Sequence, residues 1–140
     1  MPDIMHQVRI QATPERVYQA LTLPAEIRQW WTRDAELDAT VGGKGEFAFS
    51  DRKVRTTVRI DDLKADARVA WKTTASNAPG GWNGTMIEFD LRADERATVL
   101  SFAHRGFAAA DDGYARVTAG WGHYLLSLQQ YLETGKGMPA

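Results

Sequence analysis

Hydrophobic and polar residues alternate with a period of two along much of the chain, as in strands that have one covered face. The first such segment runs from Ile4 to Ile10, and His6 and Val8 share its apolar face. Most connections between the later segments are short and rich in turn residues, which favours an antiparallel meander. The remaining strands are expected at about 35–40, 44–50, 54–62, 67–75, 84–93 and 96–105.

Two short helices are expected between the first and second strands. Thr13 is placed as an N-cap with Pro14 at the first helical position, and this helix runs to about Leu21. Pro24 then begins a second short helix. Its apolar side consists of Ile27, Trp30 and Trp31.

A long helix is expected at the C-terminal end, from about Val117 to Gly135, with Asp111 or Asp112 as a cap. Gly135 is a typical helix stop, and we expect the last three residues to fray. Since one face of the strands is apolar, this helix is the candidate to cover it. Its apolar stripe consists of Tyr114, Val117, Trp121, Leu125, Leu128 and Leu132.

Two glycines, Gly120 and Gly122, flank Trp121 inside this helix. Each interior glycine costs a helix roughly 0.5–1 kcal/mol relative to alanine. We hypothesise that they clear space so that the indole of Trp121 lines a cavity. The alternative is plain packing, with small residues where the helix crosses its neighbours.

Composition sets further bounds. The chain has 140 residues, of which 44% are hydrophobic, which fits a single domain over residues 1–140. A net charge of -1 favours neither nucleic acid nor anionic lipid as a partner, and the absence of cysteine excludes disulfides and thiolate chemistry. Without a secretory pattern or an apolar run of about 18 residues, no membrane insertion and a cytoplasmic location are expected.

The chain resembles the START-related helix-grip (SRPBCC) superfamily, within it the single-domain branch named after the activator of the heat-shock-protein ATPase. The resemblance rests on the opening "VRIQATPERVYQALTLPAEIRQWW", on "FAHRGF", and on the closing "AGWGHYLLSLQQYLETGKG". It implies an α+β helix-grip fold, in which a curved seven-stranded antiparallel sheet surrounds the long C-terminal helix. It also implies a cavity between them, which in many relatives holds an apolar molecule. It does not by itself imply activation of a heat-shock ATPase, because members with that role carry an additional domain.

We expect aromatic and apolar residues from several elements to converge on this cavity as a ligand-binding site, although a filled core would use the same residues. The candidates are Trp30, Trp31, Phe47, Phe49, Trp71, Phe89, Phe102, His104, Trp121, Tyr124 and Leu125.

Other chemistry is weakly indicated. His104 and His6 share the inward phase of their strands, where an imidazole either contacts a ligand or is a hydrogen-bonded structural group. His123 should face water. The three histidines lack the spacing of metal ligands and no G-x-S-x-G motif occurs, so no metal, cofactor or nucleophile is expected.

Charged residues and one loop remain candidates at the rim. Arg33 and Arg116 are candidates to orient a polar end of a ligand, whereas strand parity places Glu88 and Arg105 on the solvated face. Trp82 lies in the loop "SNAPGGWNG" and is a lid over the cavity, a partner contact, or a side chain packed on the sheet edge.

Three functions follow from these patterns. The preferred one is non-catalytic binding of a small apolar or aromatic molecule. The second is an enzyme of cyclase or hydrolase type that uses the same cavity, with His104 or a rim carboxylate as acid or base. The third is a co-chaperone-like interaction module, which requires an exposed apolar patch around Trp82 and the short helices. A homodimer is compatible with each.

Overall fold

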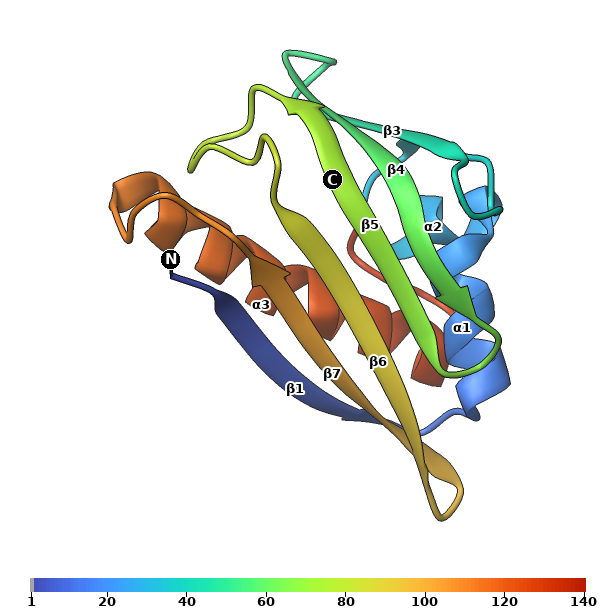
Figure 1. The fold of residues 1–140 in the computed structure, drawn as a ribbon. Coiled ribbons are helices and arrows are strands. Elements are labelled where there is room, and N and C mark those ends of the chain that lie inside the picture. The colour runs from blue at the N-terminus through green and yellow to red at the C-terminus, as the bar shows by residue number, and fades with distance from the viewer. Residues whose placement is uncertain (1) are drawn as a thin grey trace.

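The computed structural model describes residues 2–140, so Met1 lies outside the described residues. The sequence predicted the order of elements: a strand, two short helices, six strands and a long helix. Figure 1 shows them along the chain. The elements are β1 (Ile4–Ile10), α1 (Pro14–Thr22), α2 (Pro24–Trp30), β2 (Asp34–Leu37), β3 (Lys44–Phe49), β4 (Val54–Lys64), β5 (Arg68–Ser76), β6 (Met86–Asp94), β7 (Ala97–Arg105) and α3 (Asp112–Thr134).

The seven strands form one antiparallel sheet in the order β1-β7-β6-β5-β4-β3-β2. Six strands follow one another as a meander, and β1 joins the far side by pairing with β7, with Ile4 opposite His104. The sheet curves around α3, and α1 and α2 lie near the C-terminal end of this helix (Figure 1). The expected helix-grip architecture, with its α+β class, is confirmed.

Local sequence signals set the ends of the helices as expected. The hydroxyl of Thr13 accepts a hydrogen bond from the Arg16 amide at 3.2 Å, and Asp111 caps α3 by accepting one from the Tyr114 amide at 2.9 Å. Gly135 ends α3 with a φ of 88°, a left-handed conformation that glycine adopts without steric cost.

The second strand is shorter than predicted, because β2 ends at Leu37. The next residues turn at once: the Thr40 carbonyl accepts from the Gly43 amide at 2.8 Å, and the Asp38 amide donates to the Lys44 carbonyl at 3.0 Å. This tight connection takes up residues that the alternating pattern had placed in the strand.

The outer face of the sheet is charged, as the alternation predicted. Arg68 lies at the centre of an ion cluster there, with Glu88 at 2.8 Å, Asp90 at 2.9 Å and Asp62 at 3.2 Å. Arg105 also pairs with Glu88, at 2.8 Å. Both side chains therefore lie on the outer face, as strand parity predicted, with Arg105 exposed. The side chain of Glu88 is 14% exposed, because Arg68 and Arg105 cover most of it.

The inner face of the sheet packs against α3 through aromatic rings. Trp31, directly after α2, is the hub of this core, with ring centroids 5.2 Å from Trp121, 5.8 Å from Trp71 and 4.5 Å from Phe47. Phe102 extends the cluster, 4.5 Å from Trp121. Offset and tilted pairs of this kind stabilise a core beyond the area they bury.

The prediction that the last residues fray is wrong. The tail after α3 returns along α2, where the Ala140 amide donates to the Trp31 carbonyl at 2.8 Å. The buried hydroxyl of Ser127 accepts from the Met138 amide at 2.6 Å and donates to the Trp30 carbonyl at 2.8 Å. These hydrogen bonds, made by the backbone of the tail and the Ser127 hydroxyl, fix the tail, and residue composition alone does not reveal them.

Candidate functional site

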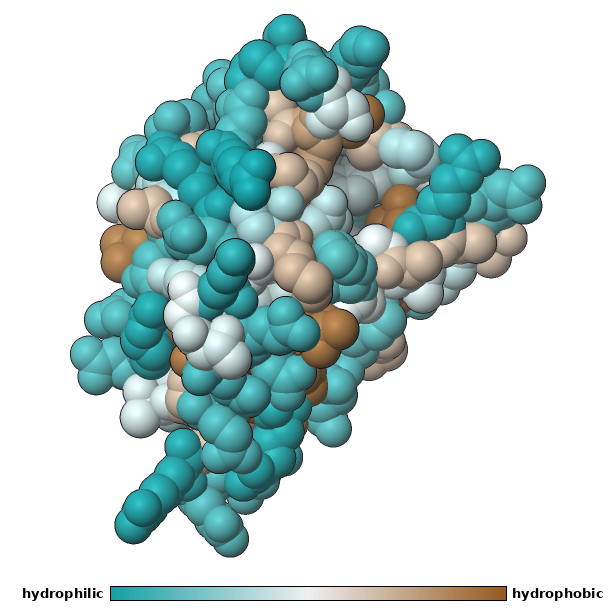
Figure 2. All heavy atoms as spheres, turned by 180° about the vertical axis from the view of Figure 1, so that it is seen from behind, coloured by the Kyte–Doolittle hydropathy of each residue, from teal (hydrophilic) through white to brown (hydrophobic). Residues whose placement is uncertain are grey.

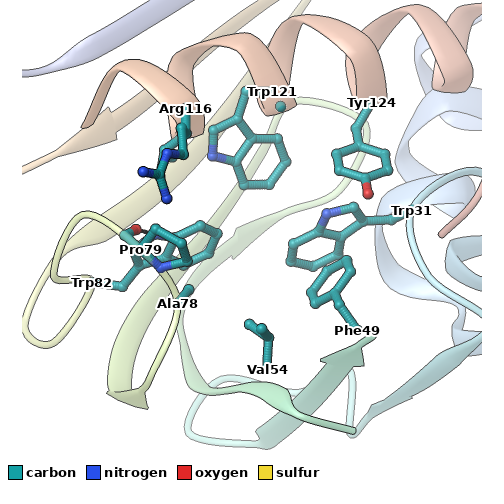
Figure 3. A pocket seen from close by; sticks show the side chains of 11 residues that line it. Trp31, Phe49, Val54, Ala78, Pro79, Trp82, Arg116, Trp121 and Tyr124 are labelled. Atoms are coloured by element: carbon teal, nitrogen blue, oxygen red, sulfur yellow. Dashed lines mark hydrogen bonds between the residues drawn. The ribbon is translucent and has the colours of Figure 1, made fainter. Parts of the chain in front are cut away.

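A cavity of about 170 Å³ lies between the first half of α3, the loop from β5 to β6, and the residues around the ends of α2 and β3. Figure 2 shows the surface from behind, mostly hydrophilic, with a hollow at the upper right lined by paler and apolar residues. The eleven lining residues, most of them labelled in Figure 3, are Trp31, Phe49, Val54, Ala78, Pro79, Trp82, Arg116, Val117, Gly120, Trp121 and Tyr124.

The walls of the cavity come from elements far apart in sequence. From one side α3 presents Trp121 and Tyr124, one turn apart on the same face (Figure 3). Trp31 and Phe49 face them from the α2 and β3 side, with ring centroids 5.5 Å apart. The β5–β6 loop closes the third side with Trp82.

The loop between β5 and β6 is held against the start of α3 by a contact between two glycines. Gly80, with a φ of 94°, lies so close to Gly113 that a β-carbon on Gly113 would come within 2.6 Å of the Gly80 nitrogen. Any side chain at Gly113 would force the two backbones apart. In Figure 1 this loop reaches toward the first turns of α3.

A chain of hydrogen bonds links the same loop to the helix through the buried His104. The Trp121 indole N–H donates to His104 Nδ1 at 3.1 Å, so the ring hydrogen lies on Nε2. His104 Nε2 then donates to the Thr85 hydroxyl at 2.8 Å, which in turn donates to the Trp82 carbonyl at 2.6 Å. The indole of Trp82 stacks near Trp121 with ring centroids 6.2 Å apart.

This environment gives His104 a structural role. The side chain is fully buried and both ring nitrogens are occupied. Burial lowers the pKa of His104 to about 3, because a charged imidazolium would lose its hydration. A neutral, doubly hydrogen-bonded imidazole behind the cavity wall is poorly placed to exchange protons with a ligand.

Three polar groups on the lining are free of protein partners. Among residues 2–140 the Trp31 indole N–H, the Tyr124 hydroxyl and the Arg116 guanidinium make no hydrogen bond or ion pair. Figure 3 shows Arg116 at one end of the cavity and Tyr124 with Trp31 at the other. Burial raises the pKa of Tyr124, so its hydroxyl remains protonated and able to donate.

The eleven candidate residues from the sequence divide into two groups. Four of them, Trp31, Phe49, Trp121 and Tyr124, are brought together on the cavity lining. The other seven are buried outside this lining, because rings of neighbouring strands pack against one another in the middle of the sheet. These are Trp30, Phe47, Trp71, Phe89, Phe102, His104 and Leu125.

Sequence reasoning gave other lining residues less weight. Trp82 is 7% exposed and forms part of the wall. In the sequence, the glycine-rich loop around Trp82 indicated that it could cover a cavity. Of the four rim charges, Arg116 alone lines this cavity, whereas Arg33 lies near the C-terminal tail. Val54 and Pro79 carried no signal, because a single apolar residue at a strand start or in a loop is common.

The glycines beside Trp121 have different surroundings. Gly120 lines the cavity, and a β-carbon there would meet nothing within 4 Å. Gly122 faces β1, where a β-carbon would be 3.7 Å from His6 Cε1, an ordinary contact. Close packing therefore does not require glycine at either position. At Gly120 the missing side chain leaves open space beside the indole of Trp121.

The size and lining of the cavity limit what it can hold. A dry apolar cavity of roughly 150 Å³ is known to bind benzene or xenon, so this one suits a molecule with one ring. The titratable lining residues are Arg116 and Tyr124, and no carboxylate is among the eleven. Within residues 2–140 no three His, Asp or Glu side chains meet to form a metal site.

None of the helices within residues 2–140 combines the length and the hydropathy that crossing a bilayer requires. A comparison with curated proteins gave no match.

The fold is shared with several solved structures. The solution structure of the Aha1 dimer from Colwellia psychrerythraea is 36% identical, with a TM-score of 0.87 over 98% of this chain and 100% of that chain. The protein SSP2350 from Staphylococcus saprophyticus is 19% identical, with a TM-score of 0.80 over 98% of this chain and 96% of that one. DynU16, a putative protein in the dynemicin biosynthetic locus, is 23% identical, with a TM-score of 0.77 over 96% of this chain and 48% of its own.

Residues 11–133 match the family model described as Activator of Hsp90 ATPase homolog 1-like protein. This match covers most of the chain and agrees with the resemblance carried by the opening helix pair and the closing tryptophan helix. The chain therefore belongs to the family of Activator of Hsp90 ATPase homolog 1-like proteins.

Proposed function

We propose that this protein binds a small aromatic molecule, without chemical conversion, in the cavity between α3 and the β5–β6 loop. The observation that carries the proposal is a cavity of about 170 Å³ whose walls are formed largely by Trp31, Trp82, Trp121, Phe49 and Tyr124. Aromatic walls suit an aromatic ligand, because offset and edge-to-face contacts add to the burial of apolar area.

The expected affinity is modest. A one-ring molecule removes roughly 150–200 Å² from water, worth about 4–5 kcal/mol at about 25 cal/mol per Å², which corresponds to a Kd on the order of 0.1–1 mM. Polar contacts at the two ends of the cavity would strengthen this value. Titrations should therefore cover the millimolar range.

The enzyme alternative has less support. It needs a titratable acid or base within reach of a ligand, and His104 lies outside the lining with both nitrogens engaged. The interaction-module alternative needed an exposed Trp82, which is instead buried. The exposed large hydrophobic side chains lie on different parts of the chain: Met5, Leu23, Val41, Leu126 and Met138.

The proposal is tested by filling the cavity. Gly120→Leu places a large side chain in the open space beside Trp121, and Ala119→Leu places the same side chain on the exposed face of α3 as the matched control. Ligand-observed NMR with toluene and phenol should detect binding to the wild type and to Ala119→Leu, and lose it in Gly120→Leu. Equal binding by both variants, or none by the wild type, would contradict the proposal.

We also propose that the chain assembles as a homodimer in the cytoplasm. The support for assembly is the 36% identity to the Colwellia psychrerythraea Aha1, which is described as a dimer. The location rests on the sequence patterns alone. Light scattering coupled to size-exclusion chromatography should give twice the mass of one chain, and the mass of a single chain would contradict the dimer.

A further inference from the structure

The mouth of the aromatic cavity carries one positive charge, that of Arg116. This residue lies in the second turn of α3, and its side chain lines the cavity beside Val117 and Gly120. In Figure 3 its guanidinium reaches toward the loop that carries Pro79, at the opposite end of the cavity from Tyr124. Its position on an exposed stretch of the helix keeps the charge in contact with water.

The charge of Arg116 is not neutralised by the protein. Within residues 2–140 no carboxylate pairs with it, although other arginines, such as Arg28, Arg52 and Arg68, form ion pairs. No Asp or Glu lines the cavity. The rings below Arg116 offer apolar surface, and the guanidinium offers several N–H donors with no acceptor assigned to them.

The two ends of the cavity therefore favour different parts of one ligand. A ring buried among Trp31, Trp82 and Trp121 gains from apolar contact, whereas an ionised carboxylate would lose its hydration there. At the mouth a carboxylate keeps part of its hydration and meets a planar guanidinium fork, which matches carboxylate geometry. The single positive charge of Arg116 balances one negative charge on the ligand, as a carboxylate carries.

We propose that the cavity is selective for one-ring aromatic carboxylates, with the ring among the tryptophans and the carboxylate at Arg116. This inference rests on the proposed function and names its ligand class. At the far end the Trp31 N–H and the Tyr124 hydroxyl are free to donate to an oxygen substituent on the ring. A ring with oxygen groups at opposite positions uses both ends of the site.

The test compares 4-hydroxybenzoate with 4-hydroxybenzamide at pH 7, since the two have nearly the same shape and differ in charge. Calorimetric or NMR titration of the wild type should give a Kd about threefold to tenfold lower for the acid, the range expected for a partly solvated ion pair. Arg116→Gln should lose this preference and still bind the amide. The matched control, Arg92→Gln, removes an exposed arginine on the outer face of β6 and should keep the preference.

The possible results are distinct. If the wild type binds acid and amide equally, or binds the amide better, selectivity for carboxylates is wrong and the aromatic cavity stands. If Arg116→Gln keeps the preference for the acid, or if Arg92→Gln loses it as well, Arg116 is not the anchor and the inference fails. If the wild type binds neither compound nor any neutral one-ring probe, the proposed function fails, and this inference with it.

Discussion

Lowering the pH from 7 to 5 should destabilise the protein through His104. In the folded state burial lowers the pKa of His104 to about 3, whereas the same side chain in the unfolded chain has a pKa near 6.5. Between these two values the unfolded chain binds a proton that the folded protein does not. Stability is therefore fully present above about pH 6.5 and decreases as the pH falls through this window.

The magnitude follows from the same two values. The free energy of unfolding should fall by up to about 1.4 kcal/mol per pH unit, which amounts to about 2 kcal/mol between pH 7 and pH 5. The structural cause is burial, because a charged ring would lose its hydration. A charged ring would also carry a hydrogen on Nδ1, the atom that now accepts from the Trp121 indole N–H.

Urea denaturation followed by tryptophan fluorescence at pH 7, 6 and 5 measures this dependence. His104→Gln should show a flatter pH dependence, whatever its stability at pH 7, and His123→Gln, at an exposed position, is the matched control that keeps the wild-type slope. A wild-type free energy of unfolding that is unchanged between pH 7 and pH 5 would refute the reasoning. A slope retained in His104→Gln would assign the effect to another group.

Three further predictions concern stability and the cavity. Gly113→Ala should lower the free energy of unfolding by about 1–3 kcal/mol and change the near-ultraviolet circular dichroism, because its β-carbon would displace Gly80; an unchanged spectrum would contradict the glycine contact. Gly120→Ala and Gly122→Ala should each raise stability in urea by about 0.5–1 kcal/mol, and Gly120→Ala alone should weaken binding of phenol; equal affinity in both would show that Gly120 does not clear ligand space. Ser127→Ala should lower stability by about 1–3 kcal/mol and speed carboxypeptidase removal of the tail, and an unchanged digestion rate would show that the tail does not depend on this hydroxyl.

Most of the fold could be predicted from the sequence because its signals are local. The alternation along β5 to β7, the Thr13 cap and Gly135 are each readable within a few residues, and short connections leave a meander as the simple topology. The C-terminal tail could not be predicted in the same way. The tail is held by the Ser127 hydroxyl, 11 residues before Met138, and by the carbonyl of Trp31, which is distant in sequence, and neither contact leaves a hydrophobic pattern in the tail.

The cavity was harder to locate than the fold. Period and phase tell which face of a strand or helix is covered, so Trp71 on a strand and Trp31 on a short helix are both predicted as inward-facing aromatics. Whether such a ring fills the core or borders a space depends on its neighbours in three dimensions, and Trp71 is surrounded while Trp31 extends to the lining. The β5–β6 loop was equally hard to place, since the conformation that brings Trp82 onto the cavity involves long-range contacts with α3 and His104.

The central claim is that the space among Trp31, Trp82 and Trp121 admits a one-ring aromatic molecule. A crystal structure of the protein grown with saturating toluene tests it most directly. We expect density for one flat molecule in contact with these three indoles, with the backbone of α3 and of the β5–β6 loop unchanged. An empty or collapsed cavity under the same conditions, with toluene absent or bound elsewhere, would contradict the account.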